Sequence, residues 1–152
     1  MLQEIRRAAR SHEVFRRILA ANDGSDHAFN ALSAAFSVAL SYKSELHMII
    51  VEEVPRFPGS IAEVKGEIEM AHERFAPMVS KSKSLAAGRG LTLHCHMVPG
   101  HAASTIVQFA REHSFDLIVI GLTPHSLLYH RLIGSIADRV VEQAPCAVLV
   151  VK

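Results

Sequence analysis

The sequence has little cysteine, few aromatic residues and almost no net charge. Only Cys95 and Cys146 occur, at no spacing typical of a metal site, and tryptophan is absent. A chain of 152 residues can bury a real hydrophobic core, so it does not need disulfides for stability. These features exclude a disulfide scaffold and a cysteine-based zinc site, and they favour a reducing, cytoplasmic compartment.

Charge of one sign is not in excess either. Lysine and arginine number 16 against 15 aspartate and glutamate, a net charge of +1. The chain as a whole lacks the electrostatic footprint of a protein that binds nucleic acid or an anionic membrane. No apolar run has the length of a secretion signal or a membrane span. We therefore expect a soluble protein whose partners are small ligands or an unknown protein.

Three motifs of common α/β enzymes are missing. No Gly-x-Gly-x-x-Gly follows the first apolar run, and neither Gly-Lys-Ser/Thr nor Gly-x-Ser-x-Gly occurs in the chain. These absences argue against the dinucleotide fingerprint, the P-loop and the hydrolase nucleophile elbow. No base that could position an attacking water is apparent. We expect a protein that is not an enzyme, or at most a slow ATPase.

Hydrophobic residues, by contrast, make up 49% of the chain and fall into two alternating patterns. Short runs rich in Ile, Val and Leu predict strands, and segments with apolar residues every three or four positions predict helices. The expected strands lie in FRRILAAND, SELHMIIVEEV, LTLHCHMV, FDLIVIG and CAVLVVK. Such alternation predicts an open parallel sheet of the α/β class with right-handed crossovers and a ligand beyond the carboxyl ends of the strands.

Individual segments allow finer predictions. The alternation of apolar and polar residues in LTLHCHMV is typical of an edge strand, whereas the nearly continuous apolar run FDLIVIG indicates a central one. The helix expected over Ile61–Ala87 contains Gly66 and Pro77, which predict a kink or an uneven start. Asp26 is expected at the start of the helix that follows the first strand.

Three stretches carry a resemblance to a known family: ILAANDGSDHA, VPGHAASTIVQFAREHSFDLIVIG and GLTPHSLLYHRLIGSIADRVVEQAPCAVLVV. Together they resemble the universal stress protein family, over about Phe15 to Val151. The family's loop reads Gly, two residues, Gly, nine residues, Gly, then Ser or Thr. Gly121, Gly134 and Ser135 stand at the matching positions, and Pro124 replaces the second glycine.

The resemblance implies a fold and an assembly. The fold is a doubly wound five-stranded parallel sheet in the order 3-2-1-4-5, with helices on both faces, formed by residues 15–152 after an N-terminal extension of residues 1–14. The assembly is a homodimer formed through the C-terminal strand. Family members fall into two groups, those that bind ATP and those that do not.

The resemblance also implies a ligand and its contacts. The ligand is an adenine nucleotide, ATP or AMP, with Mg²⁺ as a possible companion, in a cleft between the first and fourth strands. Asp23 and the backbones of Ala21 and Val51 are expected to hold the adenosine. The residues expected around the phosphates are Gly121, Gly134, Ser135 and Ile136, with Pro124 in the same loop.

Pro124 is the departure from the family pattern. Proline has no N–H and fixes φ near roughly −65°, so it removes one phosphate donor and can redirect the loop. One hydrogen bond to a charged group is worth about 1.5–3 kcal/mol, which corresponds to about tenfold to over a hundredfold in affinity. Cations in the same loop, His125, His130 and Arg131, are candidates to replace the lost donor.

Each of these residues also has a purely structural interpretation. Asp23 in an Asn-Asp-Gly-Ser segment is typical of a turn or helix cap, and Ser135 suits a helix N-cap with or without phosphate. Gly134 is compatible with a loop that needs backbone freedom. The leading hypothesis is a stress-response regulator that binds an adenine nucleotide. The alternative is a dimeric interaction protein of the same family whose cleft stays empty.

Histidine is abundant, with ten in the chain, so a metal site has to be weighed. His94 and His96 are two apart on an expected strand and therefore face the same side, as metal ligands require. A third ligand is not evident from the sequence. Because these positions form the polar side of an expected edge strand, we favour a structural role and expect no metal site.

Overall fold

The computed structural model describes residues 15–53, 60–122 and 136–152. Strands and helices alternate along the chain, as the sequence predicts. In chain order they are β1 (Arg17–Ala21), α2 (Asp26–Tyr42), β2 (Glu45–Glu53), α3 (Ile61–Ala87), β3 (Leu93–Gly100), α4 (Ala102–Glu112), β4 (Leu117–Gly121), α6 (Ile136–Gln143) and β5 (Ala147–Val151). The start of α2 at Asp26 confirms the position expected for that residue.

The five strands form one parallel sheet in the order β3-β2-β1-β4-β5, which confirms the predicted fold class. β3 is an edge strand and β4 lies inside the sheet, as their sequence patterns indicate. The chain winds from β1 through β2 to β3 in one direction and then crosses back to β4 on the other side of β1. The reversal of direction therefore falls between β1 and β4.

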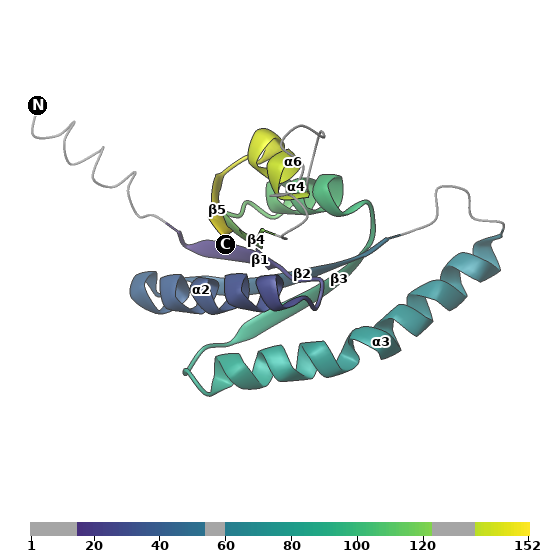
Figure 1. Ribbon diagram of the computed structural model, residues 1–152, viewed down its shortest axis with the longest axis horizontal. Coiled ribbons are helices and arrows are strands. Elements are labelled where there is room, and N and C mark those ends of the chain that lie inside the picture. Colours follow the sequence, from purple (N-terminus) through teal and green to yellow (C-terminus); the bar gives the residue numbers. More distant parts are fainter. Residues whose placement is uncertain (1–14, 54–59, 123–135) are drawn as a thin grey trace, which may run out of the picture.

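Helices cover both faces of the sheet (Figure 1). One hydrophobic core lies beneath α2 and α3, and the other beneath α4 and α6. The residues of β1 alternate between them: Ile18 and Ala20 belong to the first core, and Leu19 and Ala21 to the second. This two-residue period sends successive side chains to opposite faces, and it explains why a strand buried on both faces reads as a continuous apolar run.

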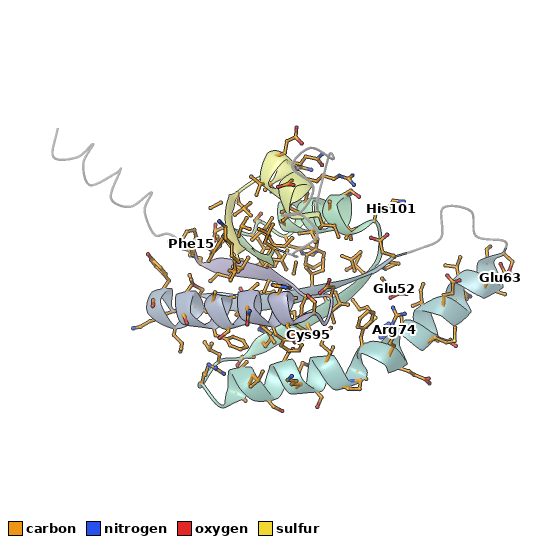
Figure 2. The ribbon with its side chains drawn as sticks, in the orientation of Figure 1. Phe15, Glu52, Glu63, Arg74, Cys95 and His101 are labelled. Atoms are coloured by element: carbon orange, nitrogen blue, oxygen red, sulfur yellow. The ribbon has the colours of Figure 1, made fainter. Side chains whose placement is uncertain are left out.

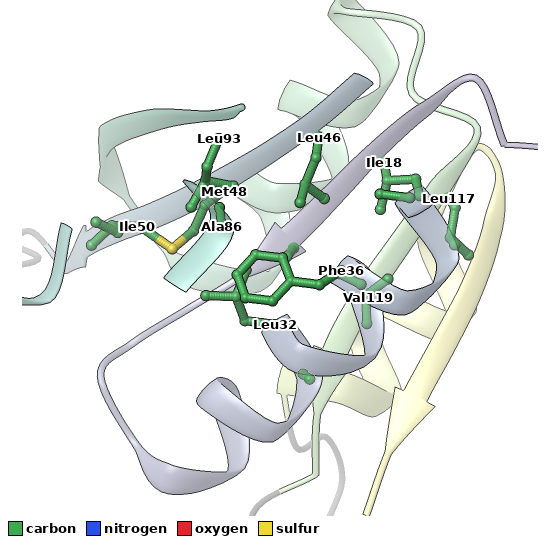
Figure 3. Close-up of a cluster of buried hydrophobic side chains, with 14 residues drawn as sticks. Ile18, Leu32, Phe36, Leu46, Met48, Ile50, Ala86, Leu93, Leu117 and Val119 are labelled. Atoms are coloured by element: carbon green, nitrogen blue, oxygen red, sulfur yellow. The ribbon is translucent and has the colours of Figure 1, made fainter. Parts of the chain in front are cut away.

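Phe36 is the largest fully buried side chain of the core beneath α2 and α3 (Figure 3). It lies on α2 together with Leu32, and both pack against side chains of the sheet such as Val119. The guanidinium of Arg89 stacks on the Phe36 ring at 5.1 Å from its centroid. The aromatic ring thus fills the space between α2 and the sheet.

α3 extends beyond the sheet at its N-terminal end (Figure 1). Only Ala71, Ser82 and Ala86 of its side chains are fully buried, and Ile61 is 80% exposed. The helix is continuous through Gly66 and Pro77 and curves along its length. None of the helices in the described ranges is both long and apolar enough to cross a membrane.

Candidate functional site at the carboxyl edge of the sheet

The strand order places the candidate site between β1 and β4. Parallel strands end at the same edge, and at this position the connections leave toward opposite faces of the sheet. Ala20 of β1 pairs with Val119 of β4, so the ends of these two strands lie next to each other. The arrangement brings Ala21 and Gly121, two of the residues expected to contact a ligand, to one edge.

The connection from β1 to α2 is a turn built by its own side chains. The Asn22 Oδ1 accepts a hydrogen bond from the Gly24 N–H at 2.8 Å, and the Asp23 Oδ1 accepts one from the Ser25 N–H at 3.0 Å. The Ser25 hydroxyl oxygen then caps α2 by accepting from the Ala28 N–H at 3.2 Å. Gly24 has φ of 87°, which glycine adopts without strain.

Asp23 thus has the structural role that its turn context indicates. The side chain is exposed at the end of β1, and its second carboxylate oxygen is not used in the bond to Ser25. A ligand contact and the turn contact can therefore coexist on one carboxylate. The role of Asp23 in nucleotide binding stays a prediction.

Asn22 is a site residue that the sequence analysis treated only as part of a turn. It is 3% exposed, its backbone N–H donates to the Ile49 carbonyl at 3.0 Å, and its amide contacts the Met48 sulfur at 3.4 Å. These contacts tie the turn to β2. A polar residue directly after a buried strand, with Gly two residues later, was the available signal.

Ala21 and Val51 lie on neighbouring strands. Ala21 is 8% exposed and pairs with Ile49, while Val51 lies two residues further along β2, half-buried, and pairs with Val98 of β3. Both side chains face the core beneath α4 and α6. Their main-chain atoms at the edge of the sheet are the groups expected to contact adenosine, and this contact also remains a prediction.

Gly121 ends β4 next to the backbone of the first turn of α2. A Cβ built on Gly121 would lie 2.5 Å from the carbonyl oxygen of His27 and 3.1 Å from the backbone nitrogen of Ala28. No real Cβ contact is this short, so only glycine allows the first turn of α2 to pack here. Gly121 therefore has a packing role in addition to the expected phosphate contact.

Ile136 is the first residue of α6 and is 46% exposed. α6 connects the parallel strands β4 and β5, so its N-terminus is directed toward the carboxyl edge of the sheet. The unpaired N–H groups and partial positive charge of a helix N-terminus favour an anion. The remaining predicted phosphate-loop residues, Pro124, Gly134 and Ser135, lie outside the described residues, as do residues 1–14.

Two glutamates at the end of β2 add contacts that the sequence analysis missed. The Glu53 carboxylate accepts a hydrogen bond from the Ala102 N–H at 3.0 Å and lies 3.5 Å from the Nδ1 of His101, so it caps α4. Glu52 forms a 2.7 Å ion pair with Arg74 of α3 (Figure 2). The N-terminus of α4 thus already has a carboxylate. The only signal for these roles is the acidic end of the apolar run SELHMIIVEEV.

His94 and His96 lie near the amino end of β3, away from the candidate site. Both contact His47 of β2: the His47 ring stacks on His94 with centroids 4.8 Å apart, and its Nδ1 lies 2.8 Å from the Nε2 of His96. Within the ranges that the structure describes, no group of three or more His, Cys, Asp or Glu is arranged to hold a metal ion.

Comparisons with known proteins identify the family. The sequence model of the universal stress protein family matches residues 15–152. The chain belongs to this family. Universal stress protein MJ0531 from Methanocaldococcus jannaschii is 36% identical over 141 residues, which cover 91% of this chain and 83% of that protein.

Solved universal stress proteins share the fold. UspA from Lactobacillus plantarum has a TM-score of 0.74 and 25% identity, covering 91% of this chain and 99% of that one. A universal stress protein in complex with cAMP has a TM-score of 0.75 and 23% identity, with 91% and 98% covered. A universal stress protein from Archaeoglobus fulgidus in complex with dAMP has a TM-score of 0.58 and 23% identity, with 90% and 96% covered. At 23% identity the last two comparisons establish the fold alone.

Proposed function

We propose that this universal stress protein is a cytoplasmic stress-response regulator that binds an adenine nucleotide, ATP or AMP, at the carboxyl edge between β1 and β4. The observation that carries the proposal is that Asp23 and Gly121 lie at the ends of the adjacent strands β1 and β4, where the strand order reverses. Ligands of open α/β sheets bind at such a position. Two proteins of the same fold have structures in complex with a nucleotide, one with cAMP and the other with dAMP, which supports an adenine ligand.

The geometry favours contacts with adenosine at one end of the site and with phosphates at the other. Ala21 and Val51 offer backbone groups on adjacent strands for the adenosine, with the exposed Asp23 carboxylate beside them. The N-terminus of α6 favours the phosphates through its N–H groups. Mg²⁺ would accompany ATP as a counter-ion of the phosphates. Since the site holds backbone donors and no assigned base, we propose binding and signalling, not metabolic catalysis, as its function.

Millimolar ATP with Mg²⁺ is expected to raise the thermal midpoint of the nucleotide-free protein. A ligand present at a hundred times its Kd stabilises the folded state by about 2.7 kcal/mol, or about 5–10 °C in a chain of this size. Differential scanning calorimetry with ATP, with AMP and with each nucleotide lacking Mg²⁺ measures the shift and the contribution of the metal. An unchanged thermal midpoint under all four conditions would reject the proposal.

Matched variants separate the ligand contact from the turn contact of Asp23. Asp23→Asn keeps an oxygen for the Ser25 N–H and removes the charge, whereas Asp23→Ala removes both. We expect both variants to lose the rise in thermal midpoint caused by nucleotide, while Asp26→Asn, in the first turn of α2, retains it.

Pro124→Gly restores a backbone donor, so it is expected to tighten nucleotide binding by about tenfold or more.

A second function, homodimerisation through β5, is favoured by the exposed apolar residues near that strand. Within the described residues β5 pairs only with β4, so its other edge retains unpaired backbone groups. Leu149 of β5 is 37% exposed, and Val141 and Ile136 of the adjacent α6 are 54% and 46% exposed. Edge-to-edge pairing of two copies would cover the strand. A protein partner of unknown identity could then recognise the dimer.

Leu149→Glu is expected to convert a dimer into a monomer. A carboxylate on each copy would be buried beside its symmetry mate, and both desolvation and like-charge repulsion oppose this. Sedimentation equilibrium measures the mass, and Leu40→Glu on α2, which is 49% exposed, is the control. A monomeric wild type, or an equal loss of mass in both variants, would reject the β5 interface. Dimerisation without nucleotide binding would favour the interaction-protein alternative.

A further inference from the structure

A cluster of titratable residues lies at the amino ends of β1, β2, β3 and β4, at the opposite end of the strands from the nucleotide site. It occupies the face of the sheet covered by α4. Its members are Arg17, Glu45, His47, His94, His96, His113 and Asp116. The universal stress protein activity proposed above makes no use of these groups.

Two imidazoles and a carboxylate form a hydrogen-bonded chain in this cluster. The Glu45 Oε1 lies 2.8 Å from the His47 Nε2, and the His47 Nδ1 lies 2.8 Å from the His96 Nε2. The two rings are within 9° of parallel with centroids 5.1 Å apart. Such a geometry describes two nearly coplanar rings joined edge to edge. His47 is only 6% exposed, so water does not readily replace these bonds.

The chemistry of the three groups sets the direction of the chain. An ionised carboxylate only accepts, so the Nε2 of His47 carries a hydrogen and donates it to Glu45. In a neutral His47 the other nitrogen, Nδ1, is then an acceptor. The Nε2 of His96 must therefore carry the hydrogen that joins the two rings. The chain runs from His96 through His47 to Glu45.

The hydrogen bonds of this His96–His47–Glu45 chain remain intact with one added proton and not with two. A proton on the Nδ1 of His96 leaves all three hydrogen-bonding groups as they are, and the charge is balanced by Glu45. A second proton must go to the Nδ1 of His47, which then carries a hydrogen facing the N–H of His96 across 2.8 Å. Two donors and two positive charges would meet, so the contact has to open.

Aromatic side chains of α4 and of the loop after it rest on the pair. The His96 ring lies 4.9 Å from Phe109 of α4, and the His47 ring meets Phe115 edge-on at 5.0 Å. Phe109 also contacts His113, at 4.3 Å. Opening the pair would therefore remove the packing contacts between the sheet and the C-terminal end of α4.

The surrounding charges act in both directions: the cation of Arg17 opposes double protonation, and the Glu45 carboxylate favours it. Arg17 lies 3.2 Å from the Glu45 carboxylate, stacks on Phe115 at 4.8 Å, and donates to the carbonyl of His113. His94 stacks on His47, and Asp116 accepts from the backbone N–H of Arg17 at 2.8 Å. Burial lowers the pKa of His47 and of His96. The hydrogen bond with His47 lowers the pKa of Glu45.

We propose that the His47–His96 pair is a proton-sensitive clasp between the sheet and the C-terminal end of α4, closed with no or one added proton and open when both imidazoles are protonated. The folded state binds these protons less readily than the unfolded chain. Stability from the clasp is therefore full above the unfolded histidine pKa of about 6.5 and is lost as pH falls below it.

The dependence of unfolding on pH tests the clasp. Each histidine that is protonated only in the unfolded state raises the unfolding equilibrium constant about tenfold per pH unit below pH 6.5. Urea unfolding of the full chain between pH 7.5 and 5 should show this dependence weakened in His96→Gln by up to tenfold per unit. The Gln amide can still donate to His47 without titrating. His72→Gln, at an exposed site on α3, should leave the dependence unchanged.

Two measurements on the wild type need no variant. Nitrogen-15 NMR of the histidine rings should show His47 and His96 with a hydrogen on Nε2 at neutral pH and titration below the unfolded histidine pKa of about 6.5. Amide exchange, corrected for intrinsic rates, should show protection falling below pH 6 in the last turn of α4 before it falls in α2. A His47 or His96 with a pKa of about 6.5 or higher, or an unchanged pH dependence in His96→Gln, would overturn the proposal.

Discussion

Phe36→Ala is expected to lower the free energy of unfolding by about 3–5 kcal/mol, because it removes a ring that is 2% exposed from the core beneath α2. The cost combines the lost transfer of the ring out of water with the cavity left between Leu32, Val119 and their neighbours (Figure 3). In a chain of this size the loss corresponds to a fall of about 6–20 °C in thermal midpoint. Native proteins are stable by only about 5–15 kcal/mol, so the effect is a large fraction of the total.

Phe36→Leu provides the matched control. Leucine keeps much of the volume, so we expect Phe36→Leu to lower the free energy of unfolding by less than Phe36→Ala does. The dependence of that free energy on urea concentration should be unchanged. Urea titration followed by circular dichroism gives both values. Equal costs for the two variants would mean that the loss comes from the Arg89 stacking contact and not from a cavity.

Gly121→Ala is expected to cost about 1–3 kcal/mol although it adds a single methyl group. The added Cβ would lie 2.5 Å from a backbone oxygen of α2, so either the helix or the end of β4 must move. Because the turn that carries Asp23 leads directly into α2, the same movement should weaken nucleotide binding. Urea unfolding measures the first effect, and calorimetric titration with ATP measures the second.

Two controls sharpen this test. Gly66→Ala lies in the interior of α3 with no atom within 4 Å of its Cβ, so it should stabilise the protein by about 0.5–1 kcal/mol. The opposite signs exclude a general effect of Gly→Ala changes. Since the clash at Gly121 is with the backbone of His27, adding His27→Ala should not restore stability. Full rescue by that second change would show that the side chain, and not the helix backbone, causes the cost.

The sequence predicted the elements well because their signals are local. Buried runs such as FDLIVIG, the turn at Asn22–Ser25 and the alternation in LTLHCHMV each reflect the conformation of a few neighbouring residues, and the structure confirms all three. The order of the strands came from the family resemblance and is also confirmed. Local periodicity contains no information on which strands pair, because the pairing depends on long connections.

The candidate site was predicted only in part. Asp23 and Gly121 were predicted from the family resemblance and lie at the expected edge, and their ligand contacts stay predictions. The close approach of His27 to Gly121 and the capping of α4 by Glu53 were missed. Both contacts join residues far apart in the chain, and nothing in either segment indicates its partner.

His47 illustrates the same limit. Within the apolar run SELHMII it appears as an isolated histidine, and His94 and His96 appear as the polar side of an edge strand. Residue composition and periodicity were enough to define the strands, their burial and the absence of common enzyme motifs. The register that places His47 opposite His94 and within reach of His96 exists only once β2 and β3 pair. The free energy of burying both faces of the sheet sets that register, and it is a property of the folded chain as a whole.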